Sequence, residues 1–237
     1  MSVAFFELHP QEWEALSLSL KVAATALAVS LPLAVLTGYG LARWRFPGHG
    51  LLNALIHMPL VMPPVVTGFV LLLVFGPAGP AGQFLSKTFG LSFAFNWMGA
   101  ALAAGVMAFP LLVRPIRLAF EAIDPKLEEA ATSLGAPRLI TFAVVTFPLA
   151  LPGVLGGAVL AFAKAMGEFG ATITFVSNIP GETRTLALAL YTATQTPSGD
   201  VMAFRLTIIS AAVALGALLL SELLARHLRR RIGAADD

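Results

Sequence analysis

Long hydrophobic runs alternate with shorter polar segments along the chain. Five runs can be marked, at residues 15–42, 51–75, 97–113, 149–170 and 204–225. A helix needs about 20 apolar residues to cross a hydrocarbon core about 30 Å thick. The third run is the shortest, and Trp97 and Arg114 flank it as anchors at the two membrane interfaces. The pattern predicts an all-α membrane protein with about five transmembrane helices, forming one domain over residues 1–237.

The composition agrees with a protein that lies in lipid. Of the 237 residues, 57% are hydrophobic and 12% are charged, and the mean hydropathy is +0.84. An ordinary soluble domain has roughly half and a quarter. The chain has no cysteine, which excludes a disulfide framework, a thiolate nucleophile and a cysteine metal site. We expect no bound metal or cofactor, no nucleic-acid partner, and a multi-pass location in the inner membrane of a bacterial cell.

The basic residues predict the orientation, because cytoplasmic loops carry an excess of Lys and Arg. Only Lys87 and Arg184 fall clearly in the loops of one side. Met1 to Trp13 has no basic patch of a signal peptide, so we expect the first run to be a retained span. We expect the N-terminus outside and the C-terminus in the cytoplasm. The other side contains ten of the 15 basic residues: Arg43, Arg45, Arg114, Arg117, Lys126, Arg138, Arg226, Arg229, Arg230 and Arg231.

The predicted cytoplasmic loop, residues 114–148, contains signals for a helical hairpin. Asp124 followed by Pro125 is typical of a helix start. Gly135 can take the left-handed conformation that ends a helix, and Pro137 can open the next one. We expect a short helix, a glycine turn, and a second helix that stops near Pro148. The shallow apolar face of the first helix suits a groove on another protein and equally suits a position on lipid headgroups.

A motif in this loop resembles the EAA loop of ABC importer permeases. Glu129, Ala130 and Ala131 are followed at the family's spacing by Gly135 and an apolar-x-Phe-Pro ending at residue 148. Val145 and Phe147 replace the usual Ile and Leu of that ending. The resemblance implies the type I importer fold and a short helix that docks into a cleft of the ATP-binding subunit. It also implies that Glu129, Ala130, Ala131 and Gly135 make this coupling contact.

The segments Ala165 to Gly170 and Thr172 to Thr185 resemble the molybdate branch of this family, to which tungstate and sulfate permeases are close relatives. The resemblance implies a transport subunit that works with a second permease copy, two ATP-binding subunits and a periplasmic molybdate-binding protein. We expect no catalysis by the chain, because no Gly-Lys dipeptide of a Walker A loop occurs.

Three alternatives remain open at this point. The substrate could be tungstate or sulfate, since composition and spacing do not separate these oxyanions. An ion-driven secondary transporter is disfavoured because five spans do not divide into equal repeats. An intramembrane enzyme is disfavoured because no nucleophile, base or metal motif occurs in the runs.

Two groups of residues are candidates for the transport pathway or its gate. Pro63 and Pro64 interrupt helical hydrogen bonding, and the freed carbonyl groups must face protein or a water-filled cavity. Thr67 would add a polar contact there, although the prolines could serve packing alone. Lys164 and Glu168 are four residues apart near the outer end of the fourth run. They should form a mutual pair, because unpaired charges are costly in a membrane. In a functional role, Lys164 would attract the oxyanion, and Glu168 would hold it in place or stabilise a gate.

Overall fold

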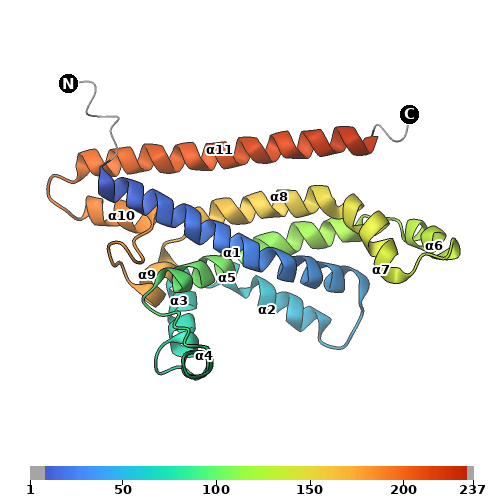
Figure 1. Ribbon diagram of the computed structural model, residues 1–237, viewed down its shortest axis with the longest axis horizontal. Coiled ribbons are helices and arrows are strands. Elements are labelled where there is room, and N and C mark those ends of the chain that lie inside the picture. The colour runs from blue at the N-terminus through green and yellow to red at the C-terminus, as the bar shows by residue number, and fades with distance from the viewer. Residues whose placement is uncertain (1–8, 234–237) are drawn as a thin grey trace.

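The computed structural model describes residues 9–233, and these form an elongated helical bundle (Figure 1). α1, α5, α8 and α11 run along its length, with the α6–α7 hairpin at one end and α9 and α10 at the other. The side-chain description of α11 stops short of Arg226, Arg229, Arg230 and Arg231. The elements are α1 (Pro10–Arg43), α2 (His49–Val61), α3 (Pro64–Phe75), α4 (Pro80–Phe89), α5 (Trp97–Glu121), α6 (Pro125–Ser133), α7 (Arg138–Thr141), the π-helical turn η1 (Phe142–Thr146), α8 (Phe147–Met166), α9 (Gly170–Val176), α10 (Leu186–Thr194) and α11 (Asp200–Gly233).

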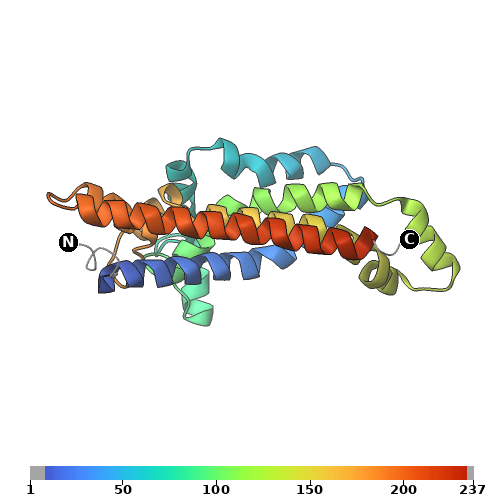
Figure 2. The same ribbon diagram turned by 90° about the horizontal axis from the view of Figure 1, so that it is seen from above.

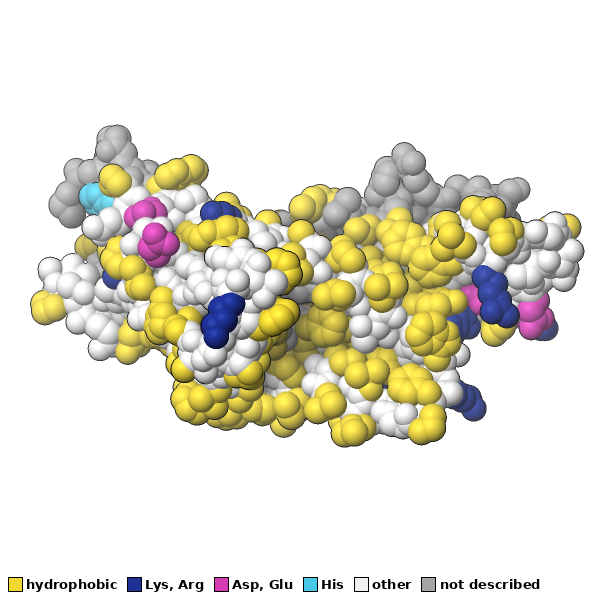
Figure 3. All heavy atoms as spheres, turned by 60° about the horizontal axis from the view of Figure 1, so that its bottom comes forward, with side chains coloured by type: hydrophobic (Ala, Val, Ile, Leu, Met, Phe, Trp, Pro, Cys, Tyr) yellow, Lys and Arg dark blue, Asp and Glu magenta, His cyan; other side chains and the backbone are white. Residues whose placement is uncertain are grey.

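Four stretches of helix in the described residues are long and apolar enough to cross a membrane, and the α2–α3 pair makes a fifth if it counts as one broken span. The four are Pro10–Arg43, Trp97–Glu121, Arg138–Met166 and Asp200–Leu220. Hydrophobic side chains cover most of the face shown in Figure 3, and charged side chains gather toward its two ends. This distribution confirms the predicted class, an all-α membrane protein. Which end faces the cytoplasm stays a prediction.

The second hydrophobic run, residues 51–75, is not one straight helix. α2 ends at Val61, α3 begins at Pro64, and the two axes are bent by 116°. Met62 and Pro63 both have extended backbone conformations. Each of them precedes a proline, and the proline ring disfavours the helical conformation of the residue before it. Two consecutive residues, Met62 and Pro63, are therefore excluded from the helix. A single proline would only kink the helix, whereas this pair breaks it.

The second helix of the predicted hairpin also continues further than the sequence predicts. The expected stop near Pro148 does not occur, because α7, η1 and α8 form one helical stretch from Arg138 to Met166. In the π turn, the Phe147 N–H donates to the Phe142 carbonyl, five residues back. Pro148 has no N–H to donate, and the wider turn just before it accommodates the proline inside the continuous helical stretch. The helix of the fourth run, residues 149–170, ends at Met166, and a new helix, α9, begins at Gly170.

The helix of the third hydrophobic run, residues 97–113, extends eight residues past the run, to Glu121. Leu112, Ile116 and Phe120 are spaced by four residues and are fully buried. Side chains at this spacing share one face of a helix, so the buried stripe of α5 continues past Arg114. α1 likewise begins before residue 15, at Pro10, where Glu12 accepts a hydrogen bond from the His9 N–H at 2.7 Å.

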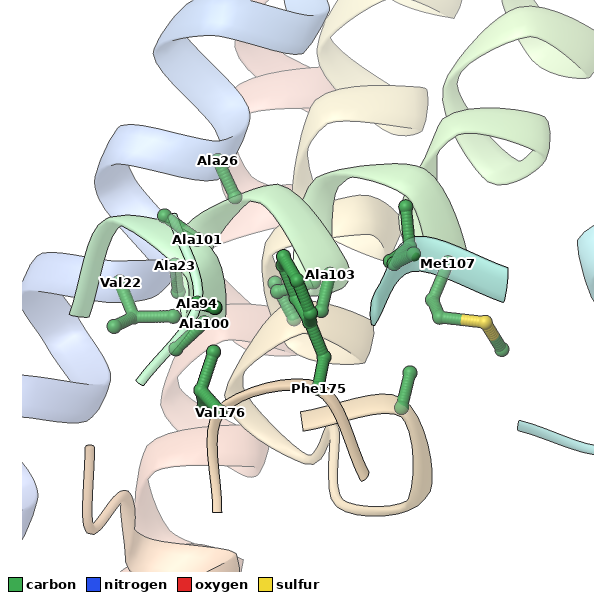
Figure 4. Packing of buried hydrophobic residues seen from close by; sticks show 14 residues of the cluster. Val22, Ala23, Ala26, Ala94, Ala100, Ala101, Ala103, Met107, Phe175 and Val176 are labelled. Atoms are coloured by element: carbon green, nitrogen blue, oxygen red, sulfur yellow. The ribbon is translucent and has the colours of Figure 1, made fainter. Parts of the chain in front are cut away.

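The core at the α9 end is built mainly of alanine. Ala100, Ala103 and Ala104 of α5 are completely buried, and so is Phe175 of α9. Figure 4 shows Phe175 directed toward the alanines of α5. Small side chains allow helix backbones to approach closely, which is the main source of packing between helices in lipid. α8 also packs closely through small residues, which recur at Gly153, Gly157, Ala161 and Ala165. A Cβ on Gly153 would lie only 2.4 Å from the Cβ of Ala119 in α5.

Candidate coupling surface and transport pathway

The helix α6 has the predicted start and the predicted end. The Asp124 carboxylate accepts a hydrogen bond from the Lys126 N–H at 2.9 Å, and Pro125 is the first helical residue. At the other end Gly135 has a φ of +90°. Its N–H donates to the carbonyl of Thr132 at 2.9 Å, and the N–H of Ala136 donates to the carbonyl of Ala131 at 3.1 Å. These two bonds form a Schellman motif, which requires a left-handed residue at the glycine position.

The motif residues lie on the outside of this hairpin. Glu129, Ala130 and Gly135 are exposed, and Ala131 is partly buried. Next to them Leu134 is 90% exposed and Leu139 is 80% exposed. Figure 1 shows the hairpin beyond the end of α5, along the long axis of the molecule. The structure thus brings the four motif residues together on one projecting surface with exposed leucines, which we call the coupling surface.

Glu128, the neighbour of the motif, anchors the hairpin to the bundle. One of its carboxylate oxygens, Oε1, accepts hydrogen bonds from Arg43 Nη2 at the end of α1 and from Thr146 Oγ1 in η1, each at 2.9 Å. The sequence motif does not include Glu128. Its partner Arg43 is 85 residues away in the chain, and no sequence signal connects them.

The two groups of pathway candidates meet at the short helix α9. A Cβ on Gly170 would lie 2.7 Å from Pro64 Cβ, and a Cβ on Gly68 would lie 2.5 Å from the Ala171 carbonyl oxygen. α9 therefore packs against α3 with almost backbone-to-backbone contact. Pro63 caps α3 and Pro64 is its first residue.

Lys164 and Glu168 form the predicted pair, with Nζ and Oε2 2.5 Å apart. The other oxygen of Glu168 accepts a hydrogen bond from the Ala171 N–H at 3.1 Å. The carboxylate thus binds both a cation on α8 and the first turn of α9. The Glu168 side chain is 2% exposed, whereas that of Lys164 is 31% exposed. Lys164 is accordingly the accessible member of the pair.

Thr67 is the one pathway candidate with an unused polar atom. Its side chain is buried, and its hydroxyl has no hydrogen-bond partner among the described residues. A buried hydroxyl without a partner costs free energy. Thr67 lies beside Gly68 on α3, at the contact with α9.

Sequence reasoning also missed a buried ion pair between the ends of the chain. Arg205 Nε of α11 lies 2.9 Å from Glu12 Oε1 of α1, and Glu12 is completely buried. The pair is separated by 193 residues. It fastens α11 to the start of α1, far from the coupling surface.

A membrane-spanning bundle with a projecting EAA-type hairpin is the architecture of an importer permease, and comparisons with known proteins agree. The family model of the binding-protein-dependent transport system inner membrane component matches residues 30–233. The chain belongs to this family of inner-membrane permeases.

Individual relatives within this family are named for the transport of particular oxyanions. The molybdenum transport system permease protein ModB of Escherichia coli (strain K12) is 56% identical over 226 residues, which cover 95% of this chain and 99% of that protein. ModB of Haemophilus influenzae is 50% identical over 225 residues, covering 95% and 98%. The sulfate transport system permease protein CysT of Salmonella typhimurium is 33% identical over 228 residues, covering 95% and 81%.

The fold itself has solved counterparts. A crystal structure of a bacterial ABC transporter that imports the acidic polysaccharide alginate superposes with a TM-score of 0.75 at 19% identity, covering 95% of this chain and 82% of that chain. This likeness supports the helix arrangement alone.

Proposed function

We propose that this chain is the permease subunit of an ATP-driven importer and that its cargo is molybdate. The observation that carries the mechanism is the projecting coupling surface. Leu134 and Leu139 are almost fully exposed there. The hairpin projects beyond the end of the bundle (Figure 1), so it would have to fold back toward the membrane in order to lie on the lipid headgroups. Exposed leucines on both sides of the turn in a projecting helical hairpin suit a groove on a partner protein. The cargo rests on the relatives named for molybdenum transport.

The partners follow from the family and from what the bundle leaves uncovered. We infer a complex of two permease copies, two ATP-binding subunits and an external binding protein for the oxyanion. Four or five spans leave too little protein to enclose a pathway. α2 has no buried residue, and α3 exposes Val65, Phe69 and Leu73. In Figure 2, α2 and α3 lie along one edge of the bundle. This edge is a suitable surface for the second copy, with the pathway between the two.

Within the pathway we assign separate roles to the pair on α8. The Lys164 ammonium group, partly exposed, would attract the oxyanion at the outer side. The Glu168 carboxylate would fix α9, through the Ala171 N–H, against the start of α3. A change in the angle between α8 and α9 would then move α3 and Thr67 together, because Gly68 and Gly170 allow no gap between these helices. Coupled movement of this kind is a means of opening and closing a gate.

Reconstitution tests both parts of the proposal. The chain is placed in liposomes with its ATP-binding subunit and the external binding protein, and uptake of labelled molybdate is followed with and without ATP. ATP-dependent uptake that competes with tungstate but hardly with sulfate supports the full proposal. Sulfate-only uptake, which the relationship to CysT makes the second candidate, would overturn the cargo. Uptake driven by an ion gradient without ATP would overturn the mechanism.

The pathway roles need a separate measurement. Lys164→Gln should lower molybdate uptake at an unchanged amount of folded complex, and Lys164→Arg should restore most of it, because the cationic charge attracts the anion. If Lys164→Gln instead lowers only the amount of folded protein, the pair has a structural role alone.

A further inference from the structure

A continuous groove follows α1, between α2 and α5. It consists of three cavities of about 570, 450 and 380 Å³. The first and second share Ile56 and Phe109 as lining residues. The second and third share Leu41, Trp44 and Phe46. We call this feature the α1–α2 groove; it extends from the middle of the bundle to the ends of α1 and α5.

The chemical character of the groove changes along its length. The two larger cavities are apolar, with Val29, Leu33 and Leu36 of α1 along their walls. The α2 residues that line the groove are Leu52, Leu55, Ile56 and Pro59. None of them is buried, so this side of α2, apart from the edge assigned to the second copy, lacks the packing that a helix in a protein core receives. An apolar ligand would supply these contacts.

The third cavity, at the end of the groove, is basic. It is lined by Arg45, His49, Arg117 and Glu121. Arg117 Nε lies 2.7 Å from Glu121 Oε1, so these two charges compensate each other. Arg45 is exposed and has no ion pair among the described residues. The cavity therefore has one uncompensated positive charge, next to an exposed tryptophan, Trp44, a residue type that prefers the membrane interface.

We propose that the α1–α2 groove binds one anionic phospholipid, with its phosphate at Arg45 and an acyl chain between α1 and α2. Basic pockets beside transmembrane helices on the cytoplasmic side are suited to anionic headgroups. Arg45 lies at the same end of the bundle as Arg43, which contacts the coupling hairpin. In the predicted orientation this end faces the cytoplasmic leaflet. A phospholipid matches both parts of the groove, with an acyl chain in the apolar part and a phosphate at the basic end. The alternative occupant, a helix of a second copy, is about 10 Å wide and would need an acidic group opposite Arg45.

Native mass spectrometry of the purified full chain in detergent tests the headgroup. The probes are phosphatidylglycerol and phosphatidylcholine with identical acyl chains. One bound phosphatidylglycerol, preferred over phosphatidylcholine, is expected. Since each basic residue strengthens binding to an anionic lipid surface by about fivefold, Arg45→Gln should weaken phosphatidylglycerol binding about fivefold and Arg45→Glu roughly thirtyfold.

A matched control separates a site from general attraction. Arg114 is exposed on α5 near the same end and does not line the groove. Arg114→Glu makes the same charge change and should leave phosphatidylglycerol binding unchanged. Equal losses in Arg114→Glu and Arg45→Glu, or no loss in either, would refute the headgroup site.

The acyl-chain part has its own test. Leu36 lines the second cavity and is 68% exposed, so Leu36→Trp should narrow the groove and weaken the binding of both lipids. Leu219→Trp is the control, because Leu219 on α11 is similarly exposed, at 64%, outside the groove. If Leu36→Trp changes the ratio of dimer to monomer and leaves lipid binding unchanged, the groove is an interface between copies and the lipid proposal is wrong.

Discussion

Replacing Gly135 by leucine should lower transport and transport-linked ATP hydrolysis together, without removing the protein from the membrane. Gly135 closes α6 with a φ of +90°, and a Cβ at this position would meet no atom within 4 Å. The substitution therefore creates no steric clash. Its whole effect is on the backbone, at the turn that sets the angle between α6 and α7.

The size of the effect follows from the left-handed conformation. An L-residue pays roughly 1–2 kcal/mol there relative to glycine. This cost lowers the population of the Schellman turn by about 5- to 30-fold relative to other turn conformations. Leaving the turn breaks the hydrogen bonds of the Gly135 and Ala136 N–H groups. The hairpin would then present Glu129 and Leu134 to the ATP-binding subunit at a different angle.

Gly90 provides a matched control. It ends α4 with a φ of +67°, and a Cβ there would also meet nothing within 4 Å. The Gly90 N–H donates to the Ser86 carbonyl at 3.0 Å and the Leu91 N–H to the Leu85 carbonyl at 3.3 Å, so the hydrogen bonds reach one residue further back than in the Schellman motif of α6, but the left-handed glycine is the same. Gly90→Leu therefore introduces a similar backbone strain, far from the coupling surface.

The assay is ATP hydrolysis stimulated by the loaded binding protein in liposomes, together with molybdate uptake. Gly135→Leu should lower both by up to about 5- to 30-fold, and Gly90→Leu should retain both, at equal amounts of inserted protein. Normal transport by Gly135→Leu would refute the docking of α6. Equal loss in the two variants would show that backbone strain, and not the coupling contact, is responsible.

Three further predictions concern stability and anchoring. Glu128→Ala should release α6 from the bundle and speed amide hydrogen exchange in residues 125–133, while the exposed control Glu129→Ala should leave that exchange unchanged; equal rates in both variants would contradict the anchor. Gly153→Ala should destabilise the protein by about 1–3 kcal/mol through overpacking, whereas Gly156→Ala, where a Cβ meets no atom within 4 Å, should be neutral or stabilising by up to about 1 kcal/mol. Thermal unfolding in detergent compares the two variants, and a lower stability of Gly156→Ala would refute the packing of α8 on α5. Glu12→Gln should lower the unfolding temperature more than Gly153→Ala does, because it leaves the buried Arg205 without its anionic partner, at a cost of roughly 3–5 kcal/mol. An unchanged unfolding temperature would show that the ion pair contributes little.

Much of the coupling surface could be predicted because its signals are local. A carboxylate before a proline starts a helix, and a glycine ends one, through hydrogen bonds that span only a few residues. Asp124 and Gly135 behave accordingly. The pair of Lys164 and Glu168 was predictable for the same reason, since residues four apart in a helix are neighbours.

The sequence by itself determined the membrane class, the approximate positions of the long helices and the helical hairpin, because hydrophobic length and local capping depend on residues close together in the chain. Only the tertiary structure decided the 116° angle between α2 and α3, the π turn that carries α8 past Pro148, and the contacts of Glu128 with Arg43 and of Glu12 with Arg205. Local sequence can interrupt a helix, but the direction in which the next helix leaves is set by packing. Gly68 and Gly170 hold α3 on α9, and such a contact depends on how distant helices cross.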